Sequence, residues 1–188
     1  IINIITLGDI MKNNKFLEKL QLVSNEDDSS ILSESNIFKN KDSIPTEVPV
    51  INLALSGKLD GGVSAGMTVL AGKSKTFKTN LALFMLRAYF QAHPDAVCIF
   101  YDSEFGSGEQ LDYFKAFEIP VDRVLHKPIF NIETLKFDFV KMLENIKRGD
   151  KVFFLIESIC GLSSNKEIED AKSEKVVADM TRAKANRS

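Results

Sequence analysis

The run from Met67 to Thr79 constrains the fold most, because a short apolar segment leads through a glycine- and lysine-containing loop directly into a helix-like stretch. Gly72, four intervening residues, then Phe77, Lys78 and Thr79 match the pattern G-x-x-x-x-G-K-[ST] at every fixed position except the second glycine. In that pattern, loop N–H groups and the helix N-terminus surround phosphate oxygens, the lysine reaches the β- and γ-phosphates, and the hydroxyl helps to hold Mg²⁺. We therefore predict a phosphate-binding P-loop, in which Lys78 is also catalytic. The residues expected to bind the phosphates of a nucleotide are Gly72, Lys73, Ser74, Lys75, Thr76, Phe77, Lys78 and Thr79.

Phe77 is the departure from this pattern. A glycine at this position permits an unusual backbone angle or a close approach to phosphate. Phe77 must therefore either adopt a conventional angle or accept strain of roughly 1–3 kcal/mol. The alternative interpretation is a lysine-rich turn between a strand and a helix. The context favours the P-loop, because the apolar segment before it and the helix-forming residues 80–90 after it are the neighbours that the motif requires.

The composition fits one α/β domain: 188 residues, of which 44% are hydrophobic and 27% charged. No apolar run approaches the ~20 residues needed to span a bilayer, and no signal-peptide pattern is evident, so we expect a cytoplasmic protein. The net charge of −2 does not indicate a nucleic-acid partner, so any such binding must be local. Cys98 and Cys160 are expected to be buried thiols, and His93 and His126 to occupy surface or turn positions, because none has partners at metal-ligand spacing.

Strand-like and helix-like runs alternate after Pro45, as is typical of a parallel sheet covered by helices. A short helix over 12–22 and a polar linker over 24–30 precede this core. We divide the chain into three parts. Residues 1–10 are either an upstream read-through before Met11 or a genuine strand, residues 11–45 precede the core, and residues 46–188 form the core. The predicted strands are 67–71, 96–101 and 152–157, and the predicted helices are 78–92, 109–117 and 133–148, the last ending at Lys147-Arg148-Gly149.

Acidic residues follow two of these strands, at the edge where open α/β sheets place their ligand sites. The first strand ends in Asp102-Ser103-Glu104, and the second ends in Glu157-Ser158. An apolar strand that closes on an acid has the form of a Walker B strand, so Glu157 is predicted to hold Mg²⁺ together with Thr79. Glu104 is then the candidate general base for the attacking water. Helix caps or ordinary turn residues are the alternative interpretation of both acids.

Three longer strings resemble the UvsX recombinases of tailed bacteriophages, the phage branch of the RecA recombinases. They are Val50–Gly62, Pro94–Gly106 and Glu174–Lys184, and the resemblance covers about residues 46–188. That branch is similar in carrying Phe before the P-loop lysine. The implied fold is a RecA-like P-loop NTPase core of the α/β class, with a mainly parallel sheet flanked by helices.

The resemblance implies a DNA-dependent ATPase that forms filaments on single-stranded DNA and promotes homologous pairing and strand exchange in phage recombination, repair and replication. It implies ATP and Mg²⁺ as cofactors, with ATP bound between neighbouring subunits in the infected host. The implied partners are single-stranded and homologous duplex DNA, further copies of the chain, and phage single-strand-binding and loading proteins. It also implies that Tyr113 stacks on adenine, that Glu104 acts on water, and that Glu157 stands where the family usually has Asp, which predicts slower hydrolysis. The resemblance further implies that 11–45 is a segment for subunit assembly and that 46–188 is a partial ATPase core. Ile37 and Phe38, an apolar pair in a polar stretch, are the candidate anchor on a neighbouring subunit, and the alternative is that they fold back on their own core.

The chain ends at Ser188 within a helix-like run and lacks the two mobile loops with which this family grips DNA, so we expect a fragment truncated at its C-terminus. Two other function classes stay open. One is a different P-loop ATPase or a kinase, and the other is an ATP-binding assembly subunit without turnover. Stimulation of hydrolysis by single-stranded DNA separates them from the recombinase.

Overall fold

The computed structural model describes residues 15–24, 29–35, 43–105 and 109–173. The chain divides into two compact units, residues 1–42 and 43–188. The first unit contains helix α2, Lys15–Leu22, within the predicted range 12–22. Residues 1–10, the anchor candidates Ile37 and Phe38, and the string 174–184 lie outside the described residues, so the predictions made for them, and the three-part division of the chain, stay predictions.

A parallel sheet of three strands, in the order β2-β1-β3, forms the centre of the second unit. Its strands are β1, Val97–Asp102, β2, Val124–Pro128, and β3, Val152–Glu157. β1 is the middle strand, and its last residue, Asp102, lies opposite Pro128 of β2 and Glu157 of β3. The helices of this unit are α4, Pro49–Ser56, α5, Lys78–Ala92, α6, Glu109–Ala116, η1, Val121–Arg123, α7, Ile132–Asn145, η2, Ile159–Gly161, and α8, Asn165–Lys172.

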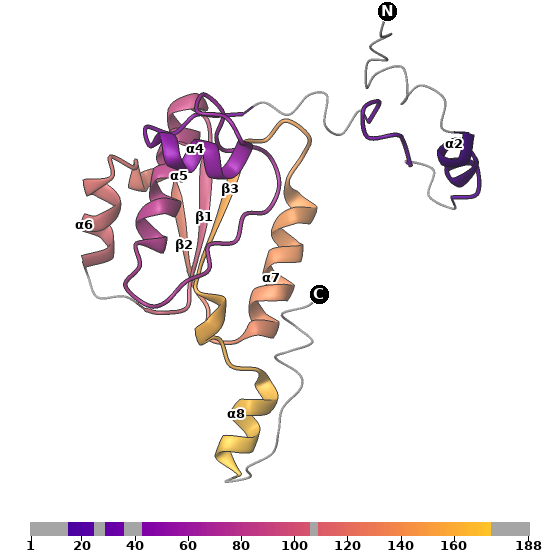
Figure 1. Ribbon diagram of the computed structural model, residues 1–188. Helices are drawn as coiled ribbons and strands as arrows, with labels where there is room; N and C mark the ends of the chain where they lie inside the picture. Colours follow the sequence, from indigo (N-terminus) through magenta and orange to yellow (C-terminus); the bar gives the residue numbers. More distant parts are fainter. Residues whose placement is uncertain (1–14, 25–28, 36–42, 106–108, 174–188) are drawn as a thin grey trace, which may run out of the picture. The chain divides into compact units, whose positions relative to one another are not determined.

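Helices cover both faces of this sheet. Successive side chains of a strand point to opposite faces, and in β1 both sets include buried apolar side chains. Cys98 and Phe100 of β1 pack in one apolar cluster with side chains of α5 and α6. Ile99 and Tyr101 pack in a second cluster with Ile132 and others from α7. Figure 1 shows α5 and α6 on one side of the strands and α7 on the other. The structure thus confirms an α/β protein with a parallel sheet flanked by helices.

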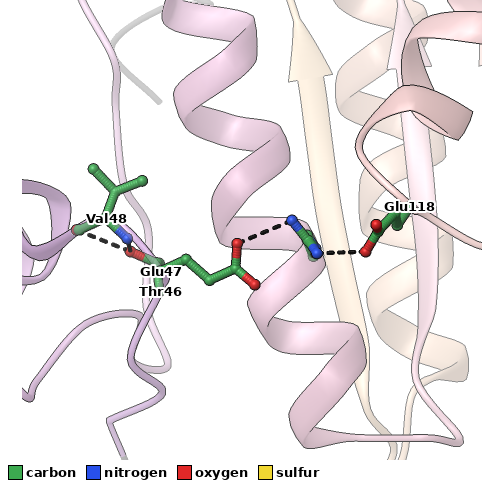
Figure 2. Close-up of polar contacts among 5 residues, drawn as sticks. Thr46, Glu47, Val48 and Glu118 are labelled. Carbon is green, nitrogen blue, oxygen red and sulfur yellow. Dashed lines mark hydrogen bonds and ion pairs between the residues drawn. The ribbon is translucent and has the colours of Figure 1, made fainter.

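The segment before α5 is attached to the core by a third apolar cluster and by ion pairs. Ile51, Val63 and Met85 form that cluster. Arg87 of α5 donates to the carboxylate of Glu47 over 3.0 Å and also to that of Glu118. Figure 2 shows the two carboxylates approaching the arginine from opposite sides, with Thr46 and Val48 beside Glu47. These contacts join the start of the core, α5 and the residues after α6.

The prediction of a strand over 67–71 is wrong, because this segment is irregular in the structure. Met67 and Val69 are exposed. A strand is defined by ladder bonds to a neighbour, and no ladder to this segment occurs within the described residues. Conversely, β2 was not predicted, because a five-residue run that contains His and Lys carries little apolar signal.

Two smaller predictions also need correction. Helix α7 ends at Asn145 rather than at residue 148, because Ile146 is extended, and the residues after it form a turn in which Gly149 has φ of +109°. Cys160 is exposed rather than buried, because it lies in the short helix η2 beyond the end of β3 and not in the strand itself. Cys98 is buried, as predicted, and that burial raises the pKa of its thiol to about 12.

Within the described ranges, no helix combines the length and the apolar character that a membrane crossing requires.

Candidate functional site

The loop over residues 72–79 folds back on itself just before α5. The Thr76 hydroxyl donates to the Lys73 carbonyl over 2.7 Å, and the Lys78 ammonium donates to the same carbonyl over 2.8 Å. A Cβ at Gly72 would lie only 2.9 Å from the Thr76 hydroxyl, so a larger residue here would displace the Thr76 side chain from this arrangement. The N–H groups of the first turn of α5 have no partners within the helix, which is the property that makes a helix N-terminus suitable for phosphate.

Phe77 takes the strained one of the two predicted alternatives. It is the N-cap of α5, and its φ of +60° and ψ of +20° lie in the left-handed region. Lys75 has a similar φ of +62°. A side chain in this region usually costs about 1–2 kcal/mol relative to glycine, because Cβ approaches the following carbonyl oxygen. The backbone therefore adopts at position 77 the conformation for which the motif ordinarily uses glycine.

The predicted magnesium residues Thr79 and Glu157 are brought together. The Thr79 hydroxyl, in the first turn of α5, donates to the carboxylate of Glu157 at the end of β3. The end of β3 is also tied to the residue after β1, because Ser103 Oγ donates to the Ser158 carbonyl and accepts from the Ser158 N–H. The loop, the start of α5 and the carboxyl ends of two strands thus meet at one edge of the sheet (Figure 1).

Glu157 lies in an environment that opposes its negative charge. Burial, the larger effect, raises the pKa of this carboxyl, and the nearby charges of Glu104 and Asp102 raise it further. The hydrogen bond from Thr79 and the charge of Lys78 act in the opposite direction but do not reverse the shift. A cation at this position would relieve the repulsion among the three carboxylates.

Glu104, the predicted general base, lies two residues beyond the end of β1, and its side chain is exposed. Its charge acts on Glu157, so the two predicted acids lie in one electrostatic neighbourhood. Its backbone N–H donates to the Asp102 carboxylate over 3.0 Å. Because the backbone of Glu104 is held by this bond and its carboxylate is exposed, the carboxylate can reach a water molecule at this edge of the sheet.

Tyr113 of α6 also reaches the start of α5. Its hydroxyl donates to Asn80 Oδ1 over 2.6 Å, and its ring meets that of Phe117 edge to face, with the ring centroids 5.4 Å apart. Asn80 follows Thr79 directly, so the aromatic ring lies near the predicted phosphate-binding residues. This placement is compatible with the predicted contact to a base, and that role stays a prediction.

One partnership was missed from the sequence. His126 of β2 is half-exposed, and its Nε2 lies 3.1 Å from Oδ2 of the buried Asp102. The expected surface position is confirmed, whereas the alternative of a turn is wrong, because His126 lies in a strand and its ring stacks on Phe100. The two residues are 24 positions apart, and only the pairing of β1 with β2 brings them together. A strand assignment for 124–128 would have been the signal.

Within the described ranges, no three or more His, Cys, Asp and Glu side chains form a group that could hold a metal ion. A magnesium ion commonly uses only one or two carboxylates together with phosphate oxygens and water, so Thr79 and Glu157 fit that kind of site.

The described residues define a small α/β protein whose parallel sheet and flanking helices are consistent with a nucleotide-binding core. Over 157 residues, the chain is 46% identical to a protein of Enterobacteria phage T4 named "Recombination and repair protein". The match takes in 84% of this chain but 40% of the relative, so the chain spans well under half of that protein's length. This similarity supports a relation to phage recombination and repair. No model of a known protein family matches the chain.

Proposed function

We propose that this chain carries the ATP-binding part of a recombinase of the UvsX and RecA kind, which hydrolyses ATP while bound to single-stranded DNA. The observation that carries the proposal is the contact between the Thr79 hydroxyl and the Glu157 carboxylate beside the 72–79 loop. The similarity to the phage T4 recombination and repair protein supports DNA as the context of that chemistry.

The residues of the site have separate roles in this proposal. The loop N–H groups and Lys78 hold the triphosphate, and in the structure the Lys78 ammonium already reaches across the loop to the Lys73 carbonyl. Thr79 and Glu157 hold Mg²⁺, which when bound neutralises developing charge on phosphate oxygens. Glu104 accepts a proton from the attacking water. Tyr113 offers its ring to the adenine base.

Assembly and DNA handling belong to the same proposal. The protein self-associates into a helical filament with ATP between subunits, and it pairs single-stranded with homologous duplex DNA. Phage proteins that bind single strands and load the filament are its expected partners. The similarity to a protein of recombination and repair supports this context.

The experiment measures phosphate release from ATP and Mg²⁺ by the full-length protein, with and without single-stranded DNA. We expect single-stranded DNA to raise the rate, and Lys78→Ala to abolish it. Lys141→Ala is the matched control, because Lys141 is an exposed lysine of α7, on the opposite face of the sheet from α5. A rate that ignores single-stranded DNA contradicts the recombinase, and transfer of phosphate to a small molecule indicates a kinase instead.

A second candidate is an ATP-binding assembly subunit that does not turn ATP over. The left-handed Phe77 and the glutamate at position 157 favour it, because both depart from the usual residue at positions where geometry matters. Comparing turnover of the protein with that of Glu157→Asp tests the effect of the longer side chain. Faster hydrolysis by the aspartate variant would show that Glu157 slows the reaction, and an unchanged rate would remove this objection to the recombinase.

A further inference from the structure

Asp102 is a buried carboxylate for which the site described so far has no use. It is the last residue of β1, and only 1% of its surface is exposed. Burying a charged group is costly unless hydrogen bonds replace its water. Asp102 obtains these bonds from three directions, and they connect it to the turn that carries Glu104.

One oxygen of this carboxylate holds the turn after β1. Oδ1 accepts from the backbone N–H of Glu104 over 3.0 Å and from that of Phe105 over 2.9 Å. Phe105 has φ of +48°, in the left-handed region, which a non-glycine residue adopts only when its surroundings require it. The two bonds to Asp102 are such a requirement, because they fix both N–H groups on a single buried acceptor.

The other oxygen is held by β2. Oδ2 lies 3.1 Å from Nε2 of His126. The His126 ring stacks on Phe100 with the ring centroids 5.4 Å apart and the planes inclined by 30°, which fixes the orientation of the imidazole. The second strand therefore positions the carboxylate, and the carboxylate positions the turn.

We propose that Asp102 is a positioning residue for Glu104 and that His126 holds Asp102 in place. The inference rests on the proposed function, in which Glu104 acts on the attacking water. Glu104 has an exposed side chain, so its backbone is the part of the residue that the protein fixes firmly. A displacement of about 1 Å in a reacting group can lower a rate by about 100-fold, so loss of this support is sufficient to slow hydrolysis strongly.

The test compares Asp102→Ala with Asp102→Asn in the full-length protein. Alanine removes both bonds to the turn, and we expect kcat to fall by about 10- to 100-fold while the Kd for ATP changes less than about twofold. Asparagine keeps a carbonyl oxygen that can accept the two N–H groups, so it should restore most of the rate. An asparagine variant as slow as the alanine variant overturns the inference, because the charge of Asp102 itself would then be required.

The hydrogen exchange of the Glu104 and Phe105 amides is a readout that does not depend on hydrolysis. We expect Asp102→Ala to accelerate exchange at these two amides and Asp102→Asn to leave them protected. His126→Leu should produce an intermediate acceleration and an intermediate loss of kcat. Unchanged exchange at both amides in the alanine variant overturns the inference, whatever the rate of hydrolysis.

Asp138→Ala is the matched control. Asp138 accepts its hydrogen bonds from the side chains of Tyr101 and Lys127 rather than from the turn after β1, so both amides and kcat should stay as in the unmodified protein. Equal losses in the Asp138 and Asp102 variants would reduce Asp102 to general support of the sheet and overturn the inference. If the unmodified protein does not hydrolyse ATP, the proposed function fails, and the exchange measurement still decides whether Asp102 fixes the turn.

Discussion

The backbone of Phe77 gives the most direct test of the loop geometry. Its φ of +60° predicts that glycine is more stable than alanine at this position, the reverse of the order in a helix. Both variants remove the same ring. Because Phe77 is 71% exposed, that ring contributes roughly 0.5–1 kcal/mol, about 0.3 of the value for a fully buried side chain. This term cancels when the two variants are compared, so their difference reports on the backbone alone.

The expected size of the difference follows from two opposing effects. The left-handed conformation costs alanine about 1–2 kcal/mol. The greater freedom of glycine in the unfolded chain takes back about 0.4–1 kcal/mol. The balance favours Phe77→Gly over Phe77→Ala by about 0.8 kcal/mol, which corresponds to roughly 0.4 M in the midpoint of a urea transition.

Phe137 provides the matched control. It is 67% exposed and lies within α7, so its ring is removed at similar cost from a helical backbone. There, Phe137→Ala should be more stable than Phe137→Gly by about 1 kcal/mol. The two sites therefore predict opposite signs in the same assay. If alanine is the more stable residue at both positions, Phe77 is not left-handed in the folded protein and the argument for loop strain is refuted.

Three further predictions concern the site and its attachment to the core. Folding raises the pKa of Glu157, so ionisation of this carboxyl above about pH 4.5 destabilises the folded state. The stability of Glu157→Gln relative to the unmodified protein should therefore increase as the pH rises above about 4.5. Melting temperatures that differ by the same amount at every pH would contradict this. Tyr113→Ala should weaken ATP binding by about 5- to 100-fold, whereas Tyr113→Phe keeps the ring and should bind nearly as tightly; equal Kd values for both variants in a calorimetric titration would argue against stacking. Glu118→Gln should lower the free energy of unfolding by about 0.5 kcal/mol at low salt and by less in 1 M NaCl, because its bond to Arg87 is exposed; a loss that is independent of salt would exclude an ion-pair origin.

The elements that could be predicted from the sequence are those whose signal is local. Helix α5 and strand β3 begin and end as predicted, because a long helix-forming run and a six-residue apolar run carry their own boundaries. The two errors in strand assignment, at 67–71 and at β2, have a different origin. The segment 67–71 has strand-forming residues but no ladder partner within the described residues, whereas β2 has weak strand-forming residues and pairs along its whole length with β1. Pairing is a property of two segments, and a single-segment pattern does not report it.

The same distinction applies to the candidate site. The loop and the acids at strand ends were predictable, because their spacing and their place after apolar runs are visible in the chain. The bond from Thr79 to Glu157 joins residues 78 positions apart, and that between His126 and Asp102 joins residues 24 apart. The first depends on how α5 packs against β3, and the second depends on the pairing of β1 with β2, so the contact of His126 was not visible from its sequence surroundings.

The three carboxylates at this edge differ in how the protein satisfies them, and that difference separates their roles. Asp102 is buried and has partners for both oxygens, from two backbone N–H groups and from His126, so its charge is matched inside the protein. Glu157 accepts a hydrogen bond from the Thr79 hydroxyl and lies near the positive charge of Lys78, and its pKa is nevertheless raised. The uncompensated negative charge of the edge therefore resides on Glu157 and its neighbour Glu104. Because a divalent cation is the partner that most effectively offsets closely spaced carboxylates, this imbalance is the physical reason to expect Mg²⁺ at Glu157 rather than at the better satisfied Asp102.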